Sequence, residues 1–584
     1  MLPYAPPIDE IDFLLRRVLD FDGQMAVLPG FSEINSDLAV NILTEGGKFC
    51  SEVLEPLNAV GDKHGCSLKD GCVATPPGMA DAYRAFAAAG WTTVSADVDY
   101  GGQGLSRVIQ ILLDEMLSSA NLSFGLFAGL TRGAAEAICH HGSEPLKAAY
   151  LPKMISGEWT GAMALTESGA GTDLGLLTTK AIPRGDGTFA VTGTKIFISS
   201  GDHDFGGNVV HLVLARLPDA PKGVKGISLF LVPKFLLNSE GGCGDRNSFA
   251  VASLEHKMGI HAQPTCMMTY EGATGWLLGE PGRGLNAMFT MMNAERLFVG
   301  IQGLGIAEIA GQKARTYAED RLQGRSSDGT RAPVAIVEHP DVRRMLLEGR
   351  SFVIAGRALA MWVALQMDIA QSHPRKEARE LANSYVELLT PVVKAAYTDM
   401  GFESSVTSQQ VFGGHGYIVE WGMEQHVRDA RITQIYEGTN GVQALDLVTR
   451  KLIANGGTTA RDFYALVRAD LTTAASIDTA AVLAGKLTVA LEKLEALTEK
   501  VNRRPGNLGA VSGYETDILR LFAHVSLGWM WVKIAAQAVS AADAAWDGKL
   551  ETARFFMDRM LPKAAVLADI LNSAMADSAL EAAA

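Results

Sequence analysis

FAVTGTKIFI at residues 189–198, VVHLVL at 209–214 and ISLFLV at 227–232 are short runs rich in β-branched and aromatic residues, and they decide the fold. Turn signals such as Gly185-Asp186-Gly187 separate them from their neighbours. Regularly spaced runs of this length, bounded by glycine-containing turns, are typical of short β-strands. The stretch therefore predicts a small antiparallel β domain at about residues 158–283.

Helical patterns flank the β region on both sides. Before it, apolar residues recur at spacings of three and four, as at Leu112, Met116 and Leu117, and the same period returns at Leu285. Strands and helices do not alternate as they would in a parallel sheet, so we predict a multidomain α+β fold. Its expected parts are an N-terminal helical domain at 1–157, the β domain at 158–283, a C-terminal helical bundle at 284–455 and a helical C-terminal extension at 456–584.

The extension carries an apolar stripe of its own. Leu487, Leu491, Leu494 and Val501 fall on one face of a predicted helix, and two further helical patterns follow near residues 515–545 and 548–576. An apolar stripe of this length must be buried. We therefore expect the helices of the extension to pack against one another.

The totals of the sequence narrow the classes of function. The 584 residues carry 51 basic and 65 acidic side chains, a net charge of −14. The electrostatic field of this negative charge repels phosphate backbones and anionic membranes, so we expect no nucleic-acid partner. The uncharged stretch at residues 116–131 is too short to span a bilayer, and the N-terminus lacks the basic and apolar regions of a secretory signal. These features predict a cytoplasmic protein without membrane insertion.

The cysteines do not form a metal motif. There are six, without a Cys-x-x-Cys pair, which is typical of thiols in a reducing compartment. His64 lies close to Cys66 and Cys72, but this spacing matches no zinc pattern. We therefore expect buried or incidental thiols and no metal.

Gly303-Leu304-Gly305 begins like a dinucleotide-binding fingerprint. No predicted strand precedes it and the third glycine is missing, whereas small residues in a helix allow another helix to approach closely. We therefore predict a helix–helix packing role for this segment.

The segment ALTESGAGTD at residues 164–173 marks the entry to the β domain. Glycines among hydroxyl residues let a chain approach a flat ligand closely and present backbone N–H groups to it. A plain turn would use the same residues. Taken alone, the segment leaves both a ligand-binding loop and a simple turn open.

The segment QIYEGTNG at residues 434–441 contains a candidate general base, Glu437. A lone glutamate before Gly-Thr is usually a solvated helix terminus or cap. Here it lies between Ile435-Tyr436 and an apolar helix predicted at 442–448. A carboxylate at an apolar margin loses solvation, which favours its neutral form and suits proton transfer.

Three segments together resemble the signatures of the acyl-CoA dehydrogenase family: TESGAGTD at 166–173, KIFISSG at 195–201 and RDARITQIYEGT at 428–439. They occur in the family's order and at its approximate spacing, and the resemblance covers about residues 45–455. The family's fold, a helical domain, a β domain and a helical bundle, is the order predicted above. The variant YEGTNGVQALDL, the loop DRLQGR and the extension resemble a larger bacterial branch that acts on 3-(methylthio)propanoyl-CoA in dimethylsulfoniopropionate degradation.

The resemblance implies one FAD per subunit. The backbone of Leu165 and the side chain of Thr166 are expected to hydrogen-bond the flavin ring. Gly171 and Thr172 are expected to lie beside the ring and the pyrophosphate.

Further FAD contacts are implied in later segments. Phe197 and Ser199 are expected on the other side of the flavin, and Thr439 at the adenine half. Arg321 is expected to reach the pyrophosphate of a second subunit's FAD, since a guanidinium fork suits phosphate. This contact implies a homodimer, with the extension covering the face that smaller relatives use to form tetramers.

The same resemblance identifies substrate-side residues. Glu437 matches the catalytic base, and Arg296 matches an arginine near it, although a surface helix charge is the simpler interpretation of Arg296. Thr172, Tyr436 and Gly438 are expected to contact the acyl-CoA. The sequence departs from the family's usual residues at several expected FAD contacts, namely Ser168, Phe197, Gln323-Gly324 and Pro340.

The implied reaction is α,β-dehydrogenation of an acyl-CoA thioester to the trans-2-enoyl-CoA. Glu437 would remove the α-proton while its backbone N–H and a ribityl hydroxyl of FAD hold the thioester oxygen, an oxyanion-hole arrangement. Electrons would then pass to an electron-transfer flavoprotein. The motif variants favour short acyl chains, including methylthiopropanoyl.

Other functions occur on the same scaffold. An acyl-CoA oxidase would pass electrons to oxygen and release peroxide. A DNA-associated flavoprotein would need a basic surface, which the acidic total and residues 456–584 do not suggest. A catalytically silent helical scaffold would purify without colour.

Overall fold

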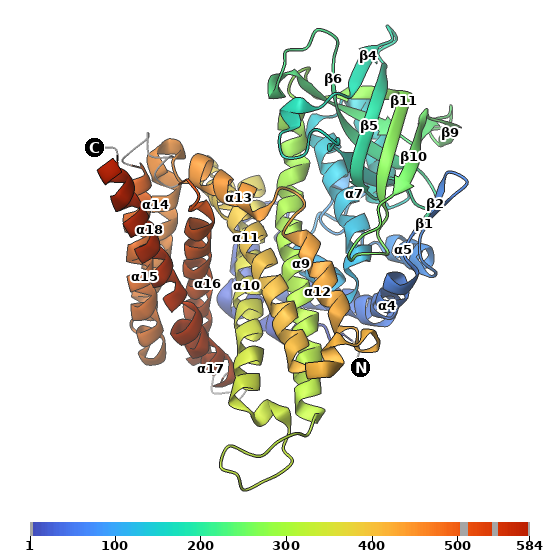
Figure 1. Ribbon diagram of the computed structural model, residues 1–584. Coiled ribbons are helices and arrows are strands. Elements are labelled where there is room, and N and C mark those ends of the chain that lie inside the picture. The colour runs from blue at the N-terminus through green and yellow to red at the C-terminus, as the bar shows by residue number, and fades with distance from the viewer. Residues whose placement is uncertain (1–3, 503–511, 540–546, 582–584) are drawn as a thin grey trace. The chain divides into compact units, whose positions relative to one another are not determined.

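The computed structural model describes residues 4–502, 512–539 and 547–581 (Figure 1). The chain divides into two compact units. Unit 1 comprises residues 1–47, 106–119 and 299–584, and unit 2 comprises residues 48–105 and 120–298. The long helix α9 (Gly284–Asp320) contributes residues to both units.

Unit 2 contains helices and all the described strands. The helices are α4 (Glu55–His64), α5 (Met79–Ala88), α7 (Leu122–His141) and α8 (Glu144–Ile155). A small hairpin of β1 (Ser67–Lys69) and β2 (Cys72–Ala74) lies between α4 and α5. The sequence patterns did not predict this hairpin, because three residues are too few for a period of two to be visible.

The main sheet confirms the strands predicted from the sequence. Its strands are β3 (Thr160–Ala164), β4 (Lys180–Pro183), β5 (Phe189–Ser199), β6 (Val209–Arg216), β7 (Ile227–Pro233), β10 (Phe249–Leu254) and β11 (Thr265–Leu278). A separate pair comprises β8 (Phe235–Leu237) and β9 (Cys243–Arg246).

The pairing of these strands differs from the expected antiparallel sheet at β6. This strand pairs antiparallel with β7 but parallel with β3 and β4. Parallel pairing requires a long connection, and more than forty residues separate β3 from β6. Because β7 pairs with both β6 and β11, the strands β11, β5, β4, β6 and β7 form a closed ring.

Alternating side chains of the sheet fill two apolar cores. In β6, Leu212 and Leu214 enter a core shared with α7 and α8, whereas Val213 and Ala215 enter a second core shared with β11. The alternation follows from the period of two in a strand, which sends successive side chains to opposite faces. Figure 1 shows α7 running beside the sheet.

Unit 1 is helical. Its N-terminal and central helices are α1 (Ile8–Phe13), α2 (Phe21–Ala26), most of α3 (Ser36–Phe49) and α6 (Arg107–Ala120), α10 (Pro340–Ser372), α11 (Lys376–Val411), α12 (Met423–Thr433) and α13 (Asn440–Asp446). The extension adds α14 (Thr458–Ala474), α15 (Asp478–Asn502), α16 (Glu515–Val539), α17 (Asp547–Phe555) and α18 (Pro562–Glu581). The tail of the pattern predicted at 515–545 lies outside the described residues.

The extension buries the stripe that the sequence predicted. Leu487, Leu491 and Leu494 are fully buried in α15, and Val501 is buried near its end. α14, α15, α16 and α18 pack side by side (Figure 1). The extension also packs on the bundle through α16, where Trp531 donates its indole N–H to the Ser351 carbonyl at 2.9 Å.

Gly303 and Gly305 serve helix packing, as predicted. A Cβ added at Gly303 would lie 2.8 Å from the carbonyl carbon of Tyr397 in α11, and one at Gly305 would lie 2.8 Å from the Glu115 carbonyl oxygen in α6. The Ser119 hydroxyl donates to the Gly305 carbonyl at 3.0 Å. Glycine is therefore required where α9 meets both neighbours.

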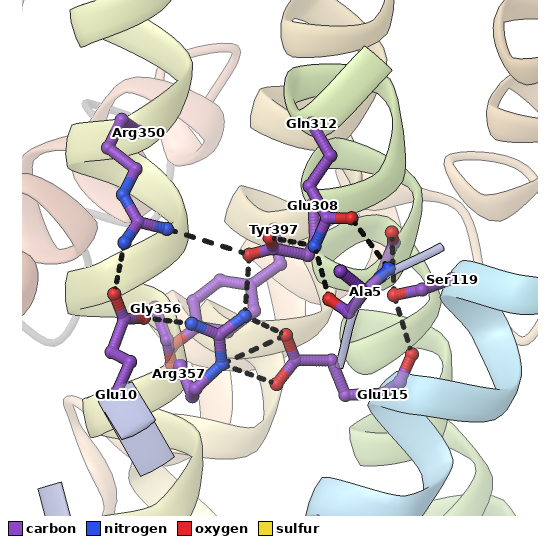
Figure 2. A network of polar contacts seen from close by, with 11 residues as sticks. Ala5, Glu10, Glu115, Ser119, Glu308, Gln312, Arg350, Gly356, Arg357 and Tyr397 are labelled. Carbon is purple, nitrogen blue, oxygen red and sulfur yellow. Dashed lines mark hydrogen bonds and ion pairs between the residues drawn. The ribbon is translucent and has the colours of Figure 1, made fainter. Parts of the chain in front are cut away.

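A buried ionic network joins four helices of unit 1 (Figure 2). The Arg357 guanidinium of α10 is 0% exposed and binds Glu10 of α1, Glu115 of α6 and Glu308 of α9. Arg350, which precedes Arg357 in α10, also binds Glu10. Each charged side chain of the network is paired with one of opposite charge, and charges can stay buried in a protein when they are paired in this way.

Within the described part of the chain, two helices are long and apolar enough to cross a membrane by length and composition, α10 and residues Glu515–Gln537 of α16. In each, 89% of the apolar window is buried inside the protein. A core helix of a globular protein has these properties, so the expectation of no membrane insertion stays a prediction.

Candidate functional site

The expected site residues fall in both units. Unit 2 holds Leu165, Thr166, Gly171, Thr172, Phe197, Ser199 and Arg296. Unit 1 holds Arg321, Tyr436, Glu437, Gly438 and Thr439.

The loop at residues 165–173, which the resemblance predicts at the flavin and which is called the flavin loop below, follows β3. Its ends are held by hydrogen bonds and its tip is open. Glu167 and Ala170 exchange backbone hydrogen bonds at 3.1 and 3.0 Å, which closes a tight turn. The Ile196 N–H donates to the Thr166 carbonyl at 2.9 Å, which ties the loop to β5. Gly171 is exposed, and a Cβ added there would meet no atom within 4 Å. The segment is therefore a turn whose glycine tip leaves room for a ligand.

A buried carboxylate anchors this loop. Glu167 accepts hydrogen bonds from the N–H and hydroxyl groups of both Thr178 and Thr179, at 2.6–3.0 Å. The Lys195 ammonium of β5, which is 0% exposed, donates to Glu167 at 2.9 Å and to the Leu165 carbonyl at 2.9 Å. The pair thus fixes the position of Leu165, an expected flavin contact.

The charge of Glu167 is strongly favoured. Burial by itself would raise the pKa of this carboxyl, but the Lys195 ammonium and the hydroxyls of Thr179 and Thr178 outweigh burial and lower the pKa to about 2. The carboxylate is therefore ionised at neutral pH. Glu167 and Lys195 both lie in the quoted motifs, but their anchoring role could not be predicted from the sequence, because it follows only from their contact.

The end of β5 presents an aromatic ring. Phe197 is 59% exposed and has a φ of +60°, a left-handed conformation that is rare for a bulky residue. Thr166 and Ser199 are half-buried and Thr172 is exposed, so a ligand can reach their hydroxyls. An exposed aromatic ring and hydroxyls that remain available fit a flat, polar-edged ligand such as a flavin.

Arg296 of α9 is buried rather than exposed. Only 6% of the residue is accessible, and its guanidinium lies 5.8 Å from the centre of the Phe289 ring. The simpler interpretation as a surface helix charge is therefore wrong. Burying a guanidinium costs desolvation free energy, which its contact with the aromatic ring partly offsets. A charge buried at such a cost suits a functional site.

Glu437 lies in a left-handed turn between α12 and α13. Its φ is +56° and that of Gly438 is +84°, so two successive residues adopt the conformation that glycine prefers. Thr439 is the N-cap of α13, with its hydroxyl accepting from the Val442 N–H at 3.4 Å. The Tyr436 hydroxyl donates to the Gln302 side-chain carbonyl of α9.

The two remaining expected contacts have structural roles in the chain itself. Thr439 caps a helix, as described, so an adenine contact would use its exposed surface. Arg321 follows the end of α9 and is exposed, and its backbone pairs with Tyr317 and Ile336. An exposed arginine at a helix end is free to reach another molecule, and its role toward a second subunit stays a prediction.

Sequence reasoning missed the residues that hold the Glu437 turn, above all Lys394 of α11. This lysine is 0% exposed and donates to the Gly438 carbonyl at 2.8 Å. A signal was present, because Lys394 stands alone in the apolar run PVVKAA at residues 391–396. A lysine is almost never buried in such a run unless its ammonium is satisfied.

A surface pocket of about 220 Å³ in unit 2 is lined by none of the expected residues. Its walls include Cys66, His256, Lys257 and His261. Burial raises the pKa of the Cys66 thiol to about 12, so the thiol stays protonated near neutral pH. No group of three or more metal-ligating side chains occurs within the described ranges, and the expectation of no metal stays a prediction.

Family models match most of the chain. They are the acyl-CoA dehydrogenase N-terminal domain at residues 47–158, its middle domain at 162–273, its C-terminal domain at 282–452 and an acetyl-CoA dehydrogenase C-terminal-like domain at 460–582. The last of these coincides with the extension.

Individual relatives agree with these models. The chain is 46% identical to the 3-methylmercaptopropionyl-CoA dehydrogenase of Ruegeria pomeroyi over 80% of this chain and 79% of that protein. The structure of Caenorhabditis elegans ACDH-11 in complex with C11-CoA is 18% identical, with a TM-score of 0.77 over 96% of this chain and 93% of that one, and shows the same fold including the extension. An electron transferring flavoprotein structure from Acidaminococcus fermentans is 28% identical, with a TM-score of 0.59 over 71% of this chain and 98% of that one. The chain therefore belongs to the acyl-CoA dehydrogenase family, whose enzymes use FAD to oxidise acyl-CoA thioesters.

Proposed function

We propose that this chain oxidises short acyl-CoA thioesters, 3-(methylthio)propanoyl-CoA in particular, with Glu437 as the base. The observation that carries the assignment of the base is the left-handed Glu437–Gly438 turn, held by a buried lysine. Strained backbone that its surroundings enforce is concentrated at functional sites. The substrate rests on the 46% identical relative, whose name specifies that acyl group.

In the proposed reaction the chain supplies a base, an oxyanion donor and a binding surface. The Glu437 carboxylate removes the α-proton, and the Glu437 backbone N–H donates to the thioester oxygen as negative charge develops there. Bound FAD supplies the hydride acceptor. Arg296, Thr172, Tyr436 and Gly438 contact the acyl-CoA.

On the cofactor side, the flavin loop and the end of β5 form the proposed binding surface. The Leu165 backbone and the Thr166 hydroxyl bond the edge of the flavin ring, and Gly171 lets the chain approach it. Phe197 packs on the ring and Ser199 bonds it. The open glycine tip and the available hydroxyls in the structure support these roles.

We also propose an electron-transfer flavoprotein as electron acceptor, a homodimer in which Arg321 serves the second subunit's FAD, and a cytoplasmic location. The 28% identical electron transferring flavoprotein structure supports the first of these. The exposed position of Arg321 supports the second. All six cysteines are free thiols in the structure, which suits a reducing compartment.

A panel of acyl-CoAs that differ in length and in a thioether substituent tests the substrate. The FAD-loaded protein should bleach its flavin fastest with 3-(methylthio)propanoyl-CoA and nearly as fast with butanoyl-CoA, whose acyl chain is shorter by a single atom. Faster bleaching by long chains would contradict the proposal. Steady peroxide release without an added acceptor would instead favour an oxidase.

A further inference from the structure

The backbone at the proposed base is held in a conformation that it would not choose by itself. A left-handed φ at Glu437 brings its Cβ close to the following carbonyl oxygen, so this state persists only when contacts enforce it. Gly438 continues the left-handed turn, and Thr439 then starts α13. The direction of the Glu437 side chain and of its N–H therefore depends on what holds this turn.

One contact is the ammonium of Lys394. Its Nζ lies 2.8 Å from the Gly438 carbonyl oxygen and 2.9 Å from Oδ1 of Asn440, the first residue of α13. The side chain is fully buried in α11, so the two bonds form in a medium of low dielectric constant and are stronger than they would be in water. The bond to the Gly438 carbonyl fixes the plane of the peptide group between Gly438 and Thr439, and the bond to Asn440 ties the start of α13 to the same ammonium.

A second contact comes from Asp399, five residues later in α11. Its Oδ1 accepts from the side-chain amides of Asn440 at 2.7 Å and Gln434 at 2.8 Å. These two residues stand on either side of Glu437 in the chain. Asp399 therefore holds both ends of the turn to the same point of α11.

The frame is completed from α13 and from the extension. Gln443 of α13 donates to the Glu437 carbonyl at 3.2 Å. Arg520 of α16 lies 3.5 Å from Oδ2 of Asp399, and its side chain is 49% exposed, so this ion pair is weak. The extension thus contacts the frame at its edge, while the strong contacts come from α11.

We propose that Lys394 and Asp399 are positioning residues for the base: together they keep the Glu437–Gly438 turn left-handed and so aim both the carboxylate and the backbone N–H of Glu437. The inference rests on the proposed role of Glu437. Neither residue needs to touch the substrate, because each acts through the turn.

The test compares Lys394→Met, which keeps the length of the side chain but removes the ammonium, with Lys533→Met as a control. Lys533 is a partly buried lysine of α16 that pairs with Asp470 at 3.1 Å, within the extension. For Lys394→Met we expect kcat to fall about 10–100-fold while KM and FAD content stay within about twofold. Lys533→Met should match the parent protein.

Two further measurements separate positioning from general stability. Hydrogen–deuterium exchange of residues 434–443 should rise in Lys394→Met both with and without FAD, and exchange in the β domain should not change. In a Glu437→Gln background, Lys394→Met should cause almost no further loss of kcat, because effects of residues that act through one another do not add.

The outcomes distinguish the inference from the function on which it rests. A Lys394→Met protein with kcat within about twofold of the parent, or a loss that adds fully to that of Glu437→Gln, would overturn the positioning role. A Glu437→Gln protein with parental kcat would overturn the base assignment itself. If Lys394→Met does not fold, Asp399→Asn carries the same three measurements, since its side chain is 19% exposed and its shape is kept.

Discussion

Replacing Arg357 with Met removes a guanidinium that is 0% exposed and keeps most of the apolar length of the side chain. It leaves Glu10, Glu115 and Glu308 facing one another, each with a side chain only 4–5% exposed (Figure 2). Removing one partner of a buried ion pair typically costs about 3–5 kcal/mol, because the remaining charge stays desolvated. For roughly 350 residues in unit 1, an unfolding entropy of about 2.1 cal/mol/K per residue converts this loss into a fall of about 4–7 °C in the melting temperature.

The loss of stability in Arg357→Met should depend on pH, and the pKa of a buried carboxyl sets the direction. In the parent protein, burial raises the pKa of the Glu115 carboxyl although Arg357 opposes this. Without Arg357 the pKa of Glu115 should rise further above its unfolded value, so the folded variant binds a proton that the unfolded chain releases. Stability of the variant then falls as the pH rises, and its deficit against the parent should be smaller near about pH 5 than near about pH 8.

The assay is thermal unfolding with saturating FAD at both pH values, followed by circular dichroism. Arg344→Met serves as the control, because Arg344 is 41% exposed and pairs with Asp341 and Glu348 at the surface, where such pairs contribute about 0–1 kcal/mol. A melting temperature within about 1 °C of the parent for Arg357→Met, or a deficit that grows at acid pH, would refute the reasoning.

Three other changes have defined outcomes. Glu437→Gln keeps the shape of the base but cannot accept the proton, so turnover should fall by at least about 10²–10⁴-fold with FAD content and acyl-CoA binding nearly unchanged, and near-parental flavin bleaching would place the base elsewhere. Glu167→Gln should lower the free energy of unfolding by about 3 kcal/mol at neutral pH and weaken FAD binding in a titration. In the parent protein the contribution of the Glu167 charge is complete above the unfolded pKa of about 4.3 and is lost as the pH falls towards about 2. Parental FAD binding by the variant would contradict the anchoring role. Gly303→Ala should destabilise the protein by about 1–3 kcal/mol in urea unfolding, because its Cβ meets the α11 backbone, whereas Gly311→Ala in the same helix has open space and should be neutral or stabilising.

The sequence alone determined the order of elements, because a period of two or of 3.6 is a local property of the chain. The runs at 189–198, 209–214 and 227–232 became β5, β6 and β7 with ends that differ by no more than two residues. The stripe at 487–501 became the buried face of α15. The segments around Thr166 and Glu437 could be singled out for the same reason, since their glycines and hydroxyl residues lie together in the chain.

The tertiary structure decided what depends on residues far apart in sequence. The ring closes only because β7 pairs with both β6 and β11, and no run of residues encodes that pairing by itself. Arg357 meets Glu10 across 347 positions and Lys394 meets Gly438 across 44, so the sequence shows an isolated charge in an apolar helix without showing its partner. A buried charge must be satisfied, but which group satisfies it depends on how the helices pack, and packing is set by the shapes of all their side chains together.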